Sequence, residues 1–304
     1  MGTWQIMTVK DLKTGQVDSI FKRRTVWTQY TGRNWTYVYM DTGRVGRKPA
    51  EFAKLAPAAK WKENYAKMWN DAGQWRFWGS GGTYWLDGNR MFYTNLVSIE
   101  PYQLQLGGME NILYINDTTY AYRSTPDKDG VVHEYTHRRL DHGGLGAGAD
   151  TTGPGAAARL IIGNWQVTSR KNHATGETEN VQQRRINWFH VTENHWTFLW
   201  MTKDRRNVIP DDLAKLPPAQ QPKERYAKIW DEDGKGVFWA SGGTYKVDGD
   251  KFMVGPRIMS IEPSMIGVTG VEPIVQLNRD IYTYASPPDA KGEVWETTHR
   301  RIDW

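Results

Sequence analysis

The chain of 304 residues contains no cysteine. Disulfide bonds and thiolate metal sites are therefore excluded, and the redox state of the compartment cannot be inferred. Long apolar runs are also missing, and without a stretch of about 20 apolar residues we expect no membrane partner. Because the first motif begins at residue 2, no signal peptide is visible, and we expect a cytoplasmic protein.

A strong charge of one sign is absent as well. The net charge is +5, and basic residues are scattered among acidic ones. A nucleic-acid-binding protein usually presents a basic stripe, so we expect no nucleic-acid partner. The sequence has no His-Glu-x-x-His, no Gly-x-Ser-x-Gly and no Walker-type phosphate loop. His190 and His195 lack a third ligand and make a poor zinc site. We therefore expect neither a metal nor an organic cofactor.

Aromatic residues are abundant, and the chain repeats itself. It contains 16 tryptophans and 15 tyrosines, a density that either fills cores or lines ligand pockets. Gly2-Thr3-Trp4 returns as Gly163-Asn164-Trp165, and the spacing stays constant as far as Gly88 and Gly249. After one added residue, a constant spacing holds to the end of the chain. We expect one domain over residues 1–141, a Gly-rich linker over 142–158 and a second domain over 159–304.

Most of each copy alternates between apolar and polar residues over short stretches. Asp87-Gly88 and Asp248-Gly249 are strong hairpin signals, because both turn positions need a positive φ. The main helical signal is the stripe Trp61, Tyr65, Met68 and Trp69. We therefore expect a mainly antiparallel, all-β fold of two fused barrels, each with one external α-helix docked on it. Their aromatic outer surfaces could bury against each other, since a duplicated domain often replaces a homodimer.

The order of these motifs resembles the calycin superfamily, and more closely the bacterial lipocalin-like domains. Those domains open with Gly-Thr-Trp, place a helix after the third strand and continue with Gly-Thr-Tyr-x-Val-Asp-Gly-Asp. The corresponding segments here are Gly-Thr-Tyr-Trp-Leu-Asp-Gly-Asn at residues 82–89 and Gly-Thr-Tyr-Lys-Val-Asp-Gly-Asp at residues 243–250. The resemblance implies two closed antiparallel barrels, each with a cavity open at one end. It fixes neither ligand nor activity, because the superfamily hosts both binders and cofactor-free enzymes.

The resemblance also implies a structural pairing. In such barrels the opening Trp closes one end, and a cation from the last strand can stack on its ring. The candidate pairs are Trp4 with Arg138 or Arg139, and Trp165 with Arg300 or Arg301.

The last strand of each copy offers two faces for chemistry. One face carries Glu134, Thr136 and Arg138, and the other carries His133, Tyr135, His137 and Arg139, with equivalents at residues 295–301. An imidazole suits proton transfer near neutral pH. The catalytic candidates are therefore His137, Arg138, His299, Arg300 and Tyr122. The alternatives are an internal salt bridge that closes the barrel and histidines that serve the common fold.

Further aromatic, imidazole and acidic side chains could bind a ligand, although a core position is the plainer interpretation of each aromatic. His195 lies beside the turn Thr192-Glu193-Asn194, so we expect it to be exposed. The ligand-binding candidates are Trp27, Tyr37, Tyr84, Tyr120, Glu134, Trp188, His190, Tyr245, Tyr284 and Glu296.

These observations predict a cofactor-independent enzyme that acts on an apolar, aromatic or polyketide-like small molecule. It would catalyse proton transfer of the isomerase, lyase or cyclase type, which needs only shape, a dry pocket and one or two acid–base groups. The alternatives are a carrier or sensor of a hydrophobic ligand, and an interaction module whose barrels are filled by their own aromatics. The sequence leaves open whether chains associate into a homo-oligomer.

Overall fold

The computed structural model describes residues 2–44, 46–141, 155–289 and 291–302. Within them, the first copy forms a closed antiparallel barrel of eight strands, in which each strand pairs with the next and the last pairs with the first. A short strand, β2 (Val17–Asp18), extends β1 outside the barrel. The barrel strands are β1 (Gly2–Asp11), β3 (Arg24–Thr31), β4 (Asn34–Asp41), β5 (Phe77–Asp87), β6 (Arg90–Ser98), β7 (Gly107–Ile115), β8 (Thr119–Ser124) and β9 (His133–Arg139).

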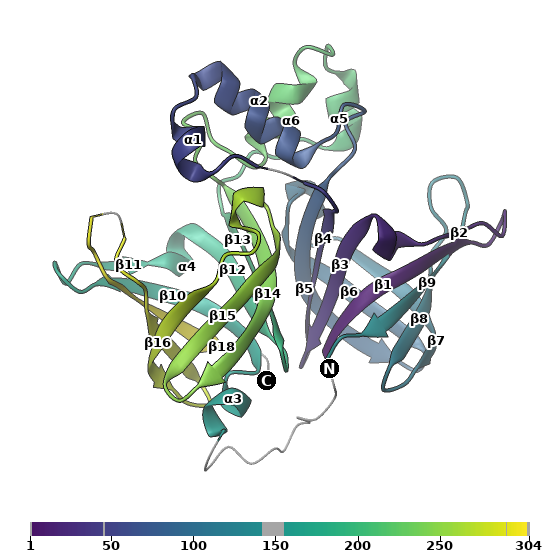
Figure 1. The fold of residues 1–304 in the computed structure, drawn as a ribbon. Helices are drawn as coiled ribbons and strands as arrows, with labels where there is room; N and C mark the ends of the chain where they lie inside the picture. The colour runs from purple at the N-terminus through teal and green to yellow at the C-terminus, as the bar shows by residue number, and fades with distance from the viewer. Residues whose placement is uncertain (1, 45, 142–154, 290, 303–304) are drawn as a thin grey trace.

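The second copy forms a second barrel of the same topology beside the first (Figure 1). A short strand, β11 (Thr178–Asn180), extends β10 as β2 extends β1. The barrel strands are β10 (Gly163–Asn172), β12 (Arg185–Val191), β13 (His195–Thr202), β14 (Phe238–Asp248), β15 (Lys251–Ser260), β16 (Gly270–Leu277), β17 (Ile281–Ala285) and β18 (Trp295–Arg301). The expected pair of fused antiparallel barrels is confirmed.

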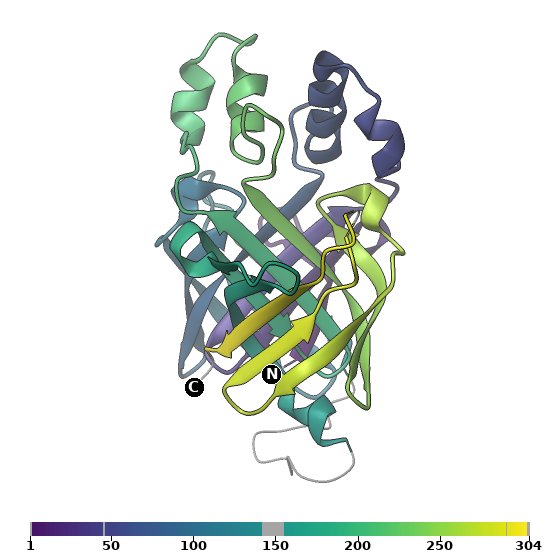
Figure 2. The same ribbon diagram turned by 90° about the vertical axis from the view of Figure 1, so that its left-hand side faces the viewer.

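The helices between β4 and β5 and those between β13 and β14 gather at one end of both barrels (Figures 1 and 2). The expected helix is α2 (Pro57–Met68), which begins at its proline, and its counterpart in the second copy is α6 (Gln221–Ala227). Each follows a shorter helix, α1 (Pro49–Ala53) or α5 (Pro210–Lys215). The aromatic stripe reaches across to the other copy, because the Trp61 and Tyr226 ring centroids lie 5.8 Å apart. Two further short helices are α3 (Ala156–Leu160) and α4 (Val181–Arg184). Residues 142–154 of the expected linker lie outside the described residues.

The largest apolar core lies between the barrels. It joins residues from the outer faces of β3–β6 to residues from β12–β15, with Trp27 and Trp188 among them. Glycines lie at this contact: a Cβ built on Gly81 would be in van der Waals contact with the Trp188 ring at 3.5 Å, and one on Gly242 with the Trp27 ring at 3.6 Å. Equivalent threonines meet near the centre of the interface, with the Thr36 and Thr197 Oγ1 atoms 2.9 Å apart. The expectation that the aromatic outer surfaces bury each other is confirmed.

Charged side chains at the rim of this core are exchanged between the copies. Arg44 donates to the carbonyl oxygens of Ser260 and Ile261 at 2.8 and 2.9 Å. Its equivalent, Arg205, donates to those of Ser98 and Ile99, both at 2.6 Å. Buried lysines also form salt bridges with the other copy: Lys67 pairs with Glu262, and Lys228 pairs with Glu100.

The opening tryptophan of each copy is buried beneath a cation from the last strand. The guanidinium carbon of Arg139 lies 5.5 Å from the Trp4 ring centroid, and that of Arg301 lies 4.1 Å from the Trp165 ring. Of the two arginines offered by each last strand, the second makes the contact. The described residues include no helix long and apolar enough to cross a membrane.

Candidate functional site

Each barrel contains a cavity whose lining is rich in aromatic side chains. The first cavity measures about 440 Å³ and the second about 350 Å³, within the usual range for small-molecule sites. The aromatic lining of the first consists of Tyr30, Trp35, Tyr37, Trp78, Tyr93, Tyr102, Tyr122 and Tyr135. That of the second consists of Phe189, Trp196, Phe198, Trp200, Trp239, Phe252 and Tyr284.

One acidic side chain reaches each cavity from an equivalent strand. Glu110 on β7 lies opposite Met91, and Glu272 on β16 lies opposite Phe252. Directly opposed residues share a face of the sheet, and both partners line the cavities, as the two glutamates do. Burial raises the pKa of each carboxyl group to about 7. Each barrel therefore holds a carboxyl group that changes its charge near neutral pH.

The neighbours of the two carboxyl groups differ. The Tyr120 hydroxyl donates to Glu110 Oε2 at 3.2 Å, and hydrogen bonds from Tyr120 and Tyr122 partly offset the effect of burial on the Glu110 pKa. In the second barrel the positive charge of Arg257 partly offsets the effect of burial on the Glu272 pKa. The Tyr282 hydroxyl, equivalent to that of Tyr120, is buried without a hydrogen-bond partner in the described part of the chain.

The histidines of the last strands face inward. His299 lines the second cavity, and its ring centroid lies 5.6 Å from that of Tyr284. His137 packs against Tyr122 at a centroid distance of 5.5 Å. Burial lowers the pKa of both imidazoles to about 3, so they remain neutral at physiological pH. A neutral imidazole with so low a pKa is a weak base.

The other face of each last strand points away from the cavities. The Arg138 and Arg300 side chains are exposed. Glu134 pairs with Arg123 at 3.1 Å, and Glu296 lies 3.1 Å from the His173 ring nitrogen. The structure therefore separates these four candidates from His137 and His299, which lie on the inward face.

The aromatic candidates fall into three places. Tyr37, Tyr122 and Tyr284 line the cavities, and Tyr120 lies behind Glu110. Tyr84 and Tyr245 stabilise turns, because their hydroxyls donate hydrogen bonds to the carbonyl oxygens of Gly32 and Thr192. Trp27, Trp188 and His190 belong to the region between the barrels, where the His190 and Trp188 rings stack at 5.9 Å.

His195 is buried, contrary to the expectation from its place beside a turn. Its Nδ1 lies 2.7 Å from Asp141 Oδ1, and its ring meets Trp27 edge-on at 4.8 Å. Burial by itself would raise the pKa of Asp141, but the contacts with His195 and the Thr3 amide outweigh it and lower that pKa. The prediction was wrong because the first barrel covers this turn.

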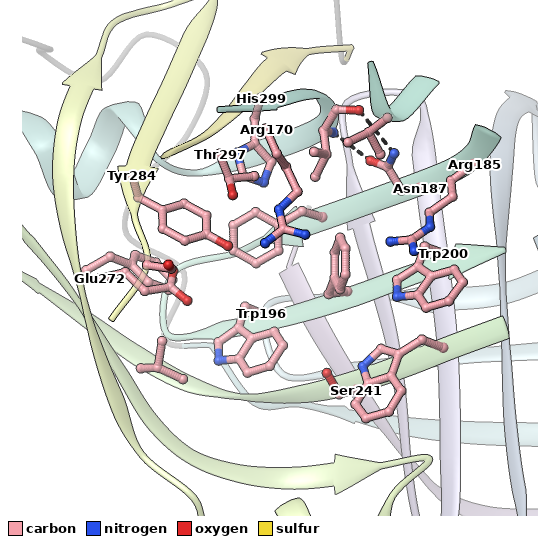
Figure 3. A pocket seen from close by; sticks show the side chains of 18 of the residues that line it. Arg170, Arg185, Asn187, Trp196, Trp200, Ser241, Glu272, Tyr284, Thr297 and His299 are labelled. Carbon is pink, nitrogen blue, oxygen red and sulfur yellow. Dashed lines mark hydrogen bonds between the residues drawn. The ribbon is translucent and has the colours of Figure 1, made fainter. Parts of the chain in front are cut away.

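The charged lining distinguishes the second cavity from the first. Arg170, Arg185 and Arg257 line the second cavity, whereas in the described part of the chain no arginine or lysine lines the first. Figure 3 shows Glu272 and Tyr284 on one side of the second cavity, with Arg185 and Trp200 on the opposite side. The Arg170 guanidinium projects between them. Among the described residues, no group of three His, Asp or Glu side chains could hold a metal ion.

The sequence reasoning missed Glu110, Glu272 and the arginines of the second cavity. A signal was present, because Glu110 and Glu272 occupy the same position in the repeat. A repeated acidic residue within an otherwise apolar strand could have marked both of them.

No protein-family model matches the chain, and no curated protein matches it either. Solved structures do show similarity. A lipocalin-like protein from Bacteroides uniformis is 11% identical, with a TM-score of 0.27, over 47% of this chain and 99% of its own. A redesigned beta barrel, mFAP1 bound to DFHBI, is 17% identical, with a TM-score of 0.24, over 48% of this chain and 98% of its own.

A Transferrin Binding Protein B double mutant from Haemophilus parasuis Hp5 is 8% identical, with a TM-score of 0.21, over 98% of this chain and 75% of its own. The fold itself is clear from the strand order of this chain. Each copy is a closed antiparallel barrel of lipocalin-like fold.

Proposed function

We propose that this pair of lipocalin-like barrels acts on a small aromatic molecule by proton transfer, with Glu272 as the general base. The observation that supports this proposal is a carboxyl group with a pKa of about 7 in a cavity rich in aromatic side chains. A general base works best when its pKa lies near the working pH. The aromatic walls would hold a flat substrate and exclude water from the reaction.

Glu272 would remove a proton from a substrate carbon next to a carbonyl group. The electron pair of that C–H bond moves toward the carbonyl oxygen, where negative charge develops. Burial raises the pKa of Tyr284, so its hydroxyl keeps its proton and can donate a hydrogen bond to that oxygen. The charge of Arg257 adds electrostatic stabilisation. Return of the proton to another atom gives isomerisation, and loss of a leaving group gives elimination.

The histidines would shape the cavity in this scheme. His299 presents a neutral ring beside Tyr284, and its low pKa makes it a far weaker base than the glutamate. The earlier candidates Tyr122 and Tyr284 keep a role as hydrogen-bond donors. Arg138 and Arg300 lie outside the cavities and take no part.

A proton-transfer probe tests the proposal without knowledge of the substrate. 5-Nitrobenzisoxazole is a neutral, flat aromatic molecule whose ring opens when a base removes one proton, and its product absorbs visible light. We expect the protein to accelerate this reaction, with a rate that rises with pH around a midpoint of about 7. Glu272→Gln should reduce the acceleration by about 100-fold or more, because general bases contribute factors of roughly 10²–10⁴.

The matched control is Glu232→Gln, which removes a carboxylate from an exposed turn and should leave the rate unchanged. Glu110→Gln reports the share of the first barrel. Unchanged acceleration in Glu272→Gln, or a rate no higher than that of buffer, would overturn the proposal.

A carrier without turnover is the second candidate, and the first barrel favours it. There the carboxyl group of Glu110 already accepts hydrogen bonds from two tyrosines, which compete with a substrate proton. Saturable quenching of tryptophan fluorescence by a metabolite that is recovered unaltered would support the carrier. The two cavities count against an interaction module whose barrels are filled by their own side chains.

A further inference from the structure

The second cavity carries positive charge at positions where the first carries none. Arg170 and Arg257 occupy the places that Val9 and Asn95 occupy in the first copy. Both arginines line the cavity, and the Arg257 Nε atom is buried without a hydrogen-bond partner in the described part of the chain. The repeat thus provides an internal comparison, in which one barrel shape is combined with two different electrostatic environments.

Arg185 has an equivalent in the first copy, Arg24, but the two are paired differently. Arg24 Nε donates to Asp41 Oδ1 at 2.6 Å across β3 and β4. The residue opposite Arg185 is Thr202, which has no charge, and its hydroxyl is buried without a partner in the described part of the chain. The ion pair that neutralises this arginine in the first copy is therefore missing in the second.

These three guanidinium groups form no salt bridge in the described part of the chain. Among the described residues, no carboxylate lies within 4.0 Å of Arg170, Arg185 or Arg257. Aromatic rings flank all three instead: the guanidinium carbon of Arg185 lies 4.3 Å from the Trp200 ring centroid, that of Arg170 lies 4.8 Å from the Trp295 ring, and that of Arg257 lies 5.8 Å from the Trp196 ring. Burial is the main cause that lowers the pKa of Arg185. The negative charge of Glu179 opposes this effect, and the positive charges of Arg184 and Arg170 add to it. Arg170 and Arg185 are therefore close enough to repel each other.

We infer that Arg170 and Arg185 bind an oxyanion, such as a carboxylate or sulfonate, carried by an aromatic ligand in the second cavity. An anion would satisfy guanidinium donors that form no salt bridge among the described residues, and arginine is the side chain best suited to hold one by paired hydrogen bonds. The aromatic body of the ligand would then extend toward Glu272 on the opposite side of the cavity (Figure 3). This inference rests on the proposed function in naming the substrate class of the same site. The first cavity, whose lining is phenolic, takes uncharged ligands.

Two probes with one ring system test this inference. 1-Anilinonaphthalene-8-sulfonate is an anion, and N-phenyl-1-naphthylamine is its neutral counterpart without the sulfonate. Both become fluorescent in apolar cavities. We expect Arg170→Val, which installs the residue of the first copy, and Arg185→Gln each to weaken binding of the anion about tenfold. Binding of the neutral probe should change less than twofold.

A third variant neutralises Arg185 without removing it. Thr202→Asp places a carboxylate where Asp41 stands in the first copy, and it should weaken binding of the anion to a similar degree. Arg279→Asn, at an exposed position of the same barrel, lowers the net charge by the same one unit and should change neither probe. Wild-type protein should bind the anionic probe more tightly than the neutral one. This comparison uses no variant, so it does not depend on how any variant folds.

The inference is overturned if wild-type protein binds both probes equally, or if the variants weaken both probes alike. Neither probe undergoes proton transfer. The two experiments therefore test separate claims. The probes test the anion site alone, and the nitrobenzisoxazole reaction tests the role of Glu272 in turnover alone.

Discussion

A buried carboxyl group with a pKa near 7 in each barrel lowers the stability of the folded protein at neutral pH. In the unfolded chain a glutamate titrates near its ordinary value of 4.5, whereas Glu110 and Glu272 in the folded protein titrate at about 7. Between these pH values the folded protein binds more protons than the unfolded chain, so its stability falls as the pH rises. Above about pH 7 the full cost is present.

Replacing either glutamate by glutamine should remove this cost. Relative to wild type, Glu110→Gln or Glu272→Gln should gain free energy of unfolding as the pH rises from 4.5 to 7, reaching about 3 kcal/mol at most. Urea unfolding at several pH values measures the difference, with Glu232→Gln as the control. A difference that stays constant over this range, or that shrinks as the pH rises, would contradict the assignment.

Residue by residue, the sequence predicted that each opening tryptophan meets a cation of the last strand, but not which one. It offered Arg138 or Arg139 as the partner of Trp4, and could not decide because β1 shifts register between Ile6 and Thr8. A shift of one residue moves every side chain of a strand to the opposite face. His195 escaped prediction for another reason: its burial depends on the other barrel, which no local pattern encodes.

At the scale of elements, β5 and β14 bring the copies into contact through small residues. Gly79 and Ala240 are equivalent positions, and a Cβ built on Gly79 would lie 2.9 Å from the Ala240 Cβ. Such a distance is too short for two carbon atoms without some movement of the strands. One copy must therefore carry glycine where the other carries alanine.

Exchanging these two residues tests the contact. Gly79→Ala alone should destabilise the protein by about 1–3 kcal/mol through overpacking. Adding Ala240→Gly should recover a large part of that loss, giving a coupling energy of about 1 kcal/mol in a double-mutant cycle of urea unfolding. If the two effects simply add, the strands do not meet as described.

The repeat predicted the elements well because it recorded each of them twice. The strands, the places of the hairpins and the helix that begins at Pro57 all follow from alternation, turn residues and an aromatic stripe. The expected Asp-Gly turn pairs were wrong by one residue, because the aspartates still pair across the strands and the turns are Gly88-Asn89 and Gly249-Asp250, where the glycines alone take a positive φ. The arrangement of the helices did not follow, since Trp61 packs on Tyr226 of the other copy. Glu110 was overlooked because a lone acidic residue in a strand is usually exposed to solvent.

At the scale of the whole molecule, fusion of the two copies allows their cavities to differ, whereas the subunits of a homodimer are identical. The outer faces of both barrels are tied to each other by a shared core and by exchanged contacts such as that of Arg44 with the Ser260 carbonyl. The interiors are free to differ, since each is encoded separately. One cavity keeps tyrosines around its carboxyl group, and the other gains Arg170 and Arg257. Duplication thus allows one interface to support two different cavities.

The most direct test of the account is a titration of the glutamate side chains by carbon-13 NMR in the intact protein. We expect the δ-carbon signals lost in Glu110→Gln and Glu272→Gln to titrate at about pH 7. If the Glu272 signal instead titrates near 4.5, its carboxyl group is not shielded from water in the cavity, and the proposed base is ruled out.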